Sequence, residues 1–147
     1  MARLWVPSLK DNPLAFVLYL FPWGQKGTPL EHFSGPRKWQ RDVLNDIALH
    51  IKNNKGVIDF AVLQEAVSSG RGIGKSALVS WLTIWMLSTR IGSTTIISAN
   101  SENQLRSITW AEITKWLAMG LNSHWFEVSA TKVAPAKWLT DLVEQDL

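Results

Sequence analysis

A glycine-rich loop between a strand-like stretch and a helix-like stretch constrains this chain most. The sequence SGRGIGKS occupies residues 69–76. Its glycines let successive backbone N–H groups converge where side chains would otherwise block an anion. Lysine and serine end the motif, as in the phosphate-binding pattern G-x-x-x-x-G-K-[ST], although Ser69 stands where that pattern has glycine. The motif in this context predicts a nucleotide-phosphate site; the alternative is a plain connecting loop.

The positions of this loop have separate expected roles. Lys75 would bring positive charge to the β- and γ-phosphates, and the Ser76 hydroxyl would be a ligand of Mg²⁺. The helix that begins here would direct the positive end of its dipole at the same phosphates. The residues expected to contact the nucleotide are Ser69, Gly70, Gly72, Gly74, Lys75, Ser76 and Ala77.

The regions around the loop alternate between helical and extended patterns. Helices are expected over residues 36–53, 75–89 and 101–119, and strands within residues 62–67, 94–98 and 125–128. This order predicts an α/β chain with the P-loop NTPase fold, a parallel sheet flanked by helices. The spacing of apolar residues does not decide between a helix and a strand for residues 14–21. Residues 137–147 are expected to be either a short helix or a frayed tail. Residues 1–35 are expected to be an irregular linker, and residues 36–147 a partial ATPase domain.

Composition limits the remaining classes of function. The chain has 147 residues, 46% apolar and 18% charged, which predicts a globular domain. It contains no cysteine, so disulfides and cysteine-ligated zinc are excluded. The three histidines lack partners at metal-ligand spacing, and the longest apolar runs are too short to cross a bilayer. The formal net charge of +3 is too small to predict nucleic-acid binding.

Several motifs together resemble the large terminase subunit of tailed bacteriophages. They are FPWG at 21–24, GPRKWQ at 35–40, SGRGIGKSAL at 69–78, SAN at 98–100 with Gln104, and Thr109-Trp110. The resemblance covers about residues 13–132. It implies a phage or prophage motor ATPase with a Walker A loop, which uses ATP and Mg²⁺ to drive double-stranded DNA into a capsid. It also implies a portal protein and a small terminase subunit as partners, a homo-oligomeric ring of the full-length protein, and action in the bacterial host cytoplasm.

The resemblance assigns roles to individual residues. Lys75 and Ser76 match the phosphate and Mg²⁺ positions of the family, and Lys75 and Arg71 match its catalytic basic residues. Gln40 matches the glutamine that recognises adenine, with Arg37 close by, and an amide suits this role because it offers a donor and an acceptor. Gln40 is alternatively an ordinary surface-helix glutamine, and Arg71 a solvated charge.

One motif that ATP hydrolysis needs in this family is missing. Four apolar residues followed by Asp-Glu would hold Mg²⁺ and position the attacking water, and the sequence contains no such run. The acidic cluster of the nuclease domain is absent as well. We therefore expect a truncated ATPase portion that binds ATP, hydrolyses it poorly and has no nuclease activity. The alternatives are another helicase-like P-loop ATPase, or a non-hydrolysing remnant or decoy module that only binds.

Overall fold

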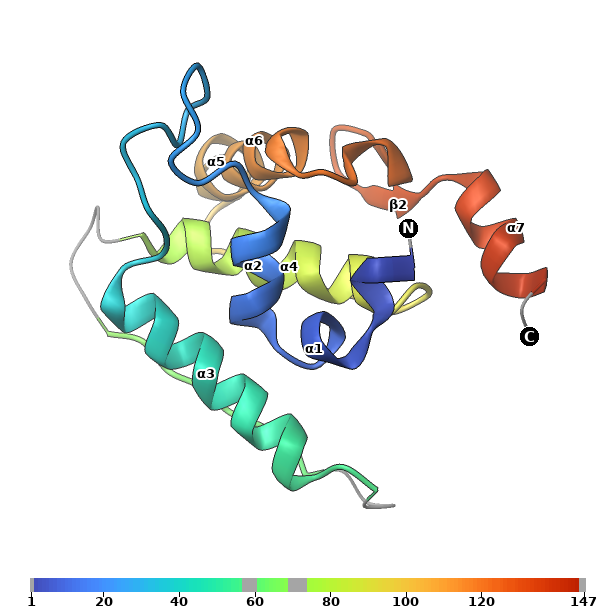
Figure 1. Ribbon diagram of the computed structural model, residues 1–147. Coiled ribbons are helices and arrows are strands. Elements are labelled where there is room, and N and C mark those ends of the chain that lie inside the picture. Colours follow the sequence, from blue (N-terminus) through green and yellow to red (C-terminus); the bar gives the residue numbers. More distant parts are fainter. Residues whose placement is uncertain (1, 57–60, 69–73, 146–147) are drawn as a thin grey trace. The chain divides into compact units, whose positions relative to one another are not determined.

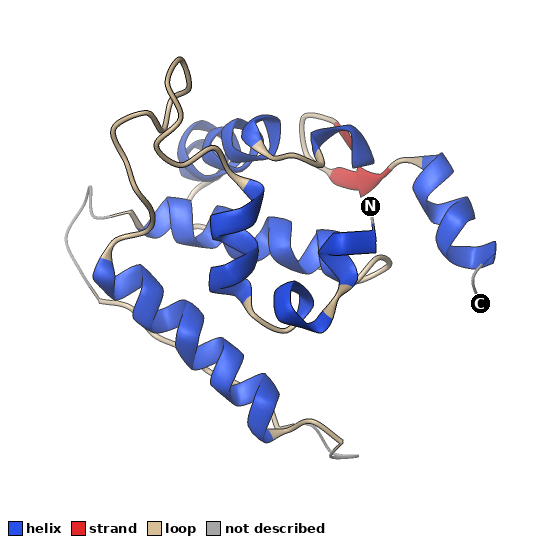
Figure 2. Ribbon diagram, viewed as in Figure 1, coloured by secondary structure: helices blue, strands red, loops and turns tan. Residues whose placement is uncertain are grey.

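The computed structural model describes residues 2–56, 61–68 and 74–145, and helices dominate it (Figures 1 and 2). The chain divides into two compact units, residues 1–75 and residues 76–147. Within the described residues, none of the helices is both long enough and apolar enough to cross a membrane. The domain boundary expected near residue 35 stays a prediction.

The first unit is built from short helices followed by one long helix. They are η1 (Ala2–Trp5), α1 (Pro7–Lys10), α2 (Pro13–Leu20) and α3 (Lys38–Asn53). The Asn12 side chain accepts a hydrogen bond from the backbone N–H of Ala15, and Pro13 occupies the first helical position, so α2 is capped as a helix. Residues 14–20 are therefore helical, and Phe21, with an extended backbone, ends the helix. Phe16 and Leu20 are fully buried, and α2 contacts α3.

Helix α3 confirms the prediction for residues 36–53, with a start two residues later than expected. It begins at Lys38 and ends at Asn53. Leu44, at the centre of the apolar stripe, is fully buried. Gln40 is also buried, although it was expected either to recognise adenine or to be an ordinary surface-helix glutamine. The reason is a tertiary hydrogen bond to Gly74, which no helical period encodes.

The helix that follows the glycine-rich loop has the expected limits. Helix α4 (Lys75–Thr89) is apolar on most sides, and Trp81, Ile84 and Trp85 are almost fully buried. The indole of Trp81 meets that of Trp116 edge to face, with ring centroids 5.2 Å apart. Buried hydroxyls in α4 form hydrogen bonds: Thr89 Oγ1 donates to the carbonyl of Trp85, one turn earlier, and Ser88 Oγ accepts from Nδ2 of Asn122.

The helix predicted over residues 101–119 is present but irregular in its middle. It consists of α5 (Glu102–Gln104), the π-helical segment η2 (Leu105–Trp110) and α6 (Ala111–Met119). The Ser101 hydroxyl caps it by accepting from the Gln104 N–H at 3.1 Å, and Gly120 follows its last residue. Ile108, which regular helical spacing would place on the apolar face, is 54% exposed. Inside the wider π-helical turn a residue no longer lies on the face that a period of 3.6 assigns to it.

The predicted parallel sheet is wrong for the part of the chain that the structure describes. The strands found there are β1 (Phe126–Val128) and β2 (Val133–Pro135), an antiparallel pair in which Phe126 lies opposite Pro135. The run at 125–128 is therefore a strand, but residues 62–67 and 94–98 are not. Their backbones make no backbone–backbone hydrogen bond with another described residue. β-Branched residues favour an extended backbone without supplying the neighbouring strand that a sheet requires.

The chain around this hairpin is helical. The short η3 (Ser123–Trp125) precedes β1, and α7 (Lys137–Gln145) follows β2. Residues 137–145 are thus a helix rather than a frayed tail. Leu139 is fully buried, and Lys137 pairs with Asp141 on the exposed face.

Candidate functional site

The C-terminal end of the glycine-rich loop, residues 74–76, is described. Gly74 has φ +96°, in the region that side chains disfavour. Lys75 is the first residue of α4 and is exposed, and Ser76 is half-buried. Four predicted site residues lie outside the described residues: Ser69, Gly70, Arg71 and Gly72.

Gln40 joins the first turn of α3 to this end of the loop. Its Nε2 donates to the carbonyl oxygen of Gly74 at 2.9 Å, and its Oε1 accepts from the backbone N–H of Arg37 at 2.8 Å. The side chain is 3% exposed. A buried amide is stable when both its oxygen and its nitrogen form hydrogen bonds, whereas leaving either group without a partner would lower the free energy of unfolding. Gln40 therefore fixes the backbone of the residue immediately before Lys75.

Two features favour glycine at position 74. A positive φ is strained for any residue with a Cβ. A Cβ at this position would also collide with Nε2 of Gln40. The backbone carbonyl of Gly74 is thus held in close contact with a buried side chain. This arrangement fits a phosphate-binding loop, in which glycine allows backbone groups to approach other atoms closely.

The arginines beside Gln40 contribute differently. Arg37 gives its backbone N–H to Gln40, and its side chain is exposed. Arg41 donates from Nε to the carbonyl of Pro36 at 3.0 Å, which orders the entry to α3. The structure therefore brings together three of the predicted site residues, Arg37, Gln40 and Gly74. The bonds of Gln40 run to protein groups, and its contact with adenine stays a prediction.

The described groups are compatible with a triphosphate and magnesium. Lys75 provides a cation, Ser76 a hydroxyl, and the first turn of the 15-residue α4, which includes Ala77, provides backbone N–H groups. Among the residues that the structure describes, no group of three or more histidines and carboxylates could hold a metal ion. The Ser76 hydroxyl stays the predicted protein ligand of Mg²⁺, on the basis of the loop motif.

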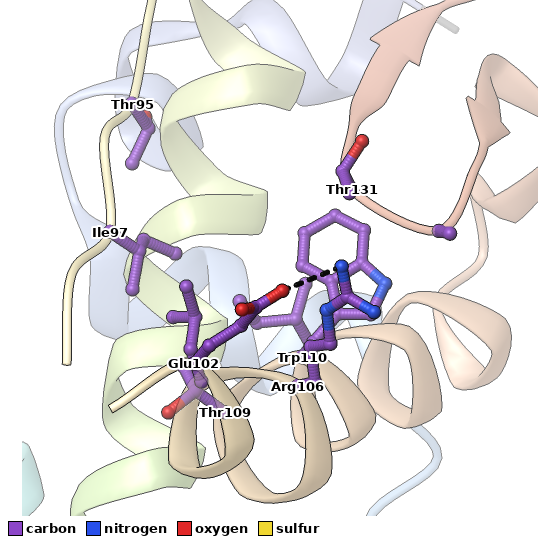
Figure 3. A pocket seen from close by; sticks show the side chains of 10 residues that line it. Thr95, Ile97, Glu102, Arg106, Thr109, Trp110 and Thr131 are labelled. Atoms are coloured by element: carbon purple, nitrogen blue, oxygen red, sulfur yellow. Dashed lines mark ion pairs between the residues drawn. The ribbon is translucent and has the colours of Figure 1, made fainter. Parts of the chain in front are cut away.

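The second unit contains a cavity that the sequence did not predict. Its volume is about 250 Å³, and it lies between the extended residues 95–97, the η2 segment and the turn at 130–131. Figure 3 shows Thr95 and Ile97 directed toward it from one side and Trp110 from another. Arg106 and Glu102 form an exposed ion pair of 2.8 Å at its edge. Residues 94–98 were expected to be a strand in a parallel sheet flanked by helices, and such packing would have left no space for a cavity beside them.

Two other motifs from the resemblance lie in this region. Asn100, the last residue of the SAN motif, is exposed, and its neighbour Ser101 is the helix cap. Thr109 and Trp110 both line the cavity. The position of Thr109 and Trp110 at the cavity could be predicted from local sequence only in part. Both lie in a π-helical segment, and such a segment depends on surrounding packing as well as on sequence.

Comparison with known proteins identifies no relative. No protein-family model matches the chain. The searches of curated proteins and of solved structures also give no match.

Proposed function

We propose that this chain is the ATP-binding part of a phage DNA-packaging motor, the large terminase subunit, and that residues 69–76 bind the triphosphate with Mg²⁺. Lys75 attracts the β- and γ-phosphates, Ser76 is a ligand of the metal, and the N-terminus of α4 stabilises the negative charge. Bound Mg²⁺ would neutralise charge on the phosphate oxygens. The proposal rests on the loop and its surroundings, and not on a parallel sheet.

The observation that carries the phosphate site is the backbone at Gly74. Three features coincide there: a positive φ, a carbonyl held by a buried glutamine, and a lysine that follows directly and starts a long helix. Each supports a loop that turns sharply before a helix N-terminus. Helix N-termini with inward-pointing N–H groups bind phosphate because the partial positive charge and the donors act together.

The wider role rests on the sequence resemblance. It supports double-stranded DNA as the cargo, a portal protein and a small terminase subunit as partners, and a ring of full-length subunits in the host cytoplasm. Arg71 is assigned to the γ-phosphate on the same basis. ATP binding can be measured on this chain alone, so it is the first part of the proposal to test.

The test is calorimetric titration of the chain with ATP–Mg²⁺, in parallel with the Lys75→Ala variant. We expect saturable binding by the parent and at least a tenfold loss of affinity in Lys75→Ala, because the side chain that faces the phosphates loses its charge. Lys52→Ala is the matched control, since Lys52 is an exposed lysine in the long helix α3. That control should bind ATP as the parent does.

Two results would contradict the phosphate site. One is the absence of a binding isotherm from protein whose circular dichroism shows it to be folded. The other is equal binding by the parent and Lys75→Ala. Competition by inorganic triphosphate would further show that affinity resides in the phosphates rather than in the base.

A further inference from the structure

The peptide group between Pro36 and Arg37 is bonded at both of its ends by side chains of α3. Its carbonyl oxygen, on Pro36, accepts a hydrogen bond from Nε of Arg41 at 3.0 Å. Its N–H, on Arg37, donates to Oε1 of Gln40 at 2.8 Å. A peptide group is planar, so the directions of its C=O and its N–H cannot change independently. The bond from Arg41 therefore constrains the direction in which the Arg37 N–H meets Gln40.

The Gln40 amide takes one orientation because two different backbone groups face it. Its Oε1 meets the N–H of Arg37, and its Nε2 meets the carbonyl of Gly74 at 2.9 Å. The reversed amide would place its oxygen against that carbonyl and its NH₂ group against that N–H, so both bonds would be lost. Because the side chain is 3% exposed, solvent could not easily replace them. A correctly placed Arg37 N–H therefore keeps Nε2 directed at Gly74.

A second peptide group lies at the other end of the Gln40 side chain. The carbonyl of Gly74 belongs to the same planar unit as the backbone N–H of Lys75. By bonding to the carbonyl, Gln40 constrains the direction of this N–H as well. Lys75 is the first residue of α4, and the proposed site takes donors for phosphate from the first turn of this helix. All of these residues belong to the first compact unit, residues 1–75, so the series is complete within one unit.

The Arg41 side chain lies close to the turn that it bonds. The backbone N–H of Arg41 donates to the carbonyl of Arg37 at 3.0 Å. A Cβ added at Gly35 would lie 3.0 Å from Nη2 of Arg41 and 3.3 Å from Cδ2 of Leu18. The guanidinium group thus follows the backbone at both Gly35 and Pro36, although the residue as a whole is exposed. A planar guanidinium is well suited to this position, because it loses less freedom per hydrogen bond than a flexible ammonium group does.

We propose that Arg41 is a positioning residue for the proposed phosphate site. It sets the orientation of the Gln40 amide by holding the peptide group that precedes Arg37. Gln40 in turn sets the orientation of the peptide group that precedes Lys75. The effect on ATP rests on the proposed function of residues 69–76, and it arises because a site that is already ordered loses less entropy when its ligand binds.

The alternative role for Arg41 is direct attraction of the nucleotide by its positive charge, and a lysine separates the two roles. Arg41→Lys keeps the charge but removes the planar group that places Nε–H at the carbonyl. Lys38→Ala is the matched control, because it removes one positive charge from the same turn of α3. The Lys38 side chain is exposed, and its ion pair of 2.9 Å with Asp42 is exposed as well, so this control should cost little stability.

Calorimetric titration with ATP–Mg²⁺ tests the effect on binding. We expect Arg41→Lys and Arg41→Ala each to weaken ATP binding about fivefold, and Lys38→Ala to bind as the parent does. In a Gln40→Ala background, Arg41→Ala should cause no further loss, because the amide through which it acts is gone. Equal losses from Arg41→Ala with and without Gln40 would overturn the proposal. Full affinity in Arg41→Lys, or an equal loss in Lys38→Ala, would also overturn it, since charge alone would then explain the effect.

Nuclear magnetic resonance of the chain without nucleotide tests the orientation itself. The signals of the Gln40 side-chain amide and of the Lys75 backbone N–H should shift in Arg41→Lys and stay in place in Lys38→Ala. A role confined to the start of α3 would leave the Lys75 signal unchanged, and that result would refute the proposal. The measurement also separates two failures. If the parent binds no ATP, the phosphate site is refuted, whereas the Lys75 signal still decides whether Arg41 orients the end of the loop.

Discussion

At the scale of single residues, the contact between Gln40 and Gly74 explains why the loop ends as it does. A side chain in the first turn of α3 bonds to a carbonyl 34 positions later in the sequence. The distant partner has a positive φ, so its backbone orientation is set by conformation and by contact together. Glycine allows the positive φ at position 74, and the hydrogen bond from Gln40 then fixes the position of Gly74, directly before Lys75.

Replacing Gly74 by alanine should destabilise the chain more than the same change at Gly92. Gly92 has φ +93°, but a Cβ added there would have no atom within 4 Å, whereas a Cβ at Gly74 would meet Gln40. We expect about 1–2 kcal/mol from backbone strain at either site, and about 1 kcal/mol more at Gly74 from the displaced hydrogen bond. Urea unfolding measures both, provided that each variant unfolds in one transition. Equal losses would show that the contact with Gln40 contributes nothing.

The role of Gln40 in nucleotide recognition can be separated from its role in holding the loop. Because its amide is buried and bonded to Gly74 and Arg37, we expect Gln40→Ala to weaken ATP and GTP binding by a similar factor. Loss of a positioning residue affects the phosphates, which the two nucleotides share. A selective loss of ATP, measured by parallel titrations with both nucleotides, would instead assign Gln40 to the adenine edge.

At the scale of elements, the longer helices were predictable, whereas the sheet and the short helices η1 and α1 in the stretch expected to be irregular were not. Helix α4 has the predicted limits, and α3 ends where expected, because apolar spacing, turns and caps are local signals. The cap at Ser101 is likewise a local signal, because Ser101 and Gln104 have the spacing of a capping pair. Residues 94–98 have strong strand propensity, yet pairing depends on a partner strand that can come from anywhere in the chain or beyond it.

The residues of the candidate site also fall into two groups, those that local sequence predicted and those that depend on contacts with distant segments. The motif at 69–76 identified Lys75 and Ser76 directly, because their order is itself the signal. The burial of Gln40 could not be read from its helix, since the cause is a carbonyl in another segment. The cavity beside Trp110 was missed for a similar reason: it exists because residues 95–97 border it without forming a sheet.

At the scale of the whole molecule, binding and turnover of ATP are separate questions. In the proposed site, Lys75 and Ser76 would supply a cation for the phosphates and a hydroxyl for the metal. Turnover additionally needs a carboxylate that holds Mg²⁺ and a group that orients the attacking water. No adjacent Asp-Glu pair occurs anywhere in the sequence. We therefore predict that this chain binds ATP–Mg²⁺ without sustained hydrolysis.

Phosphate release under steady-state conditions, measured with a large excess of ATP over protein, tests this prediction. The parent should release phosphate no faster than Lys75→Ala, although calorimetry should show that only the parent binds. A parent rate well above that of Lys75→Ala, continuing over many turnovers, would contradict the prediction, because the missing carboxylates would then have to be replaced by groups of this chain. Agreement with it would favour a module that binds nucleotide and leaves hydrolysis to residues supplied from elsewhere.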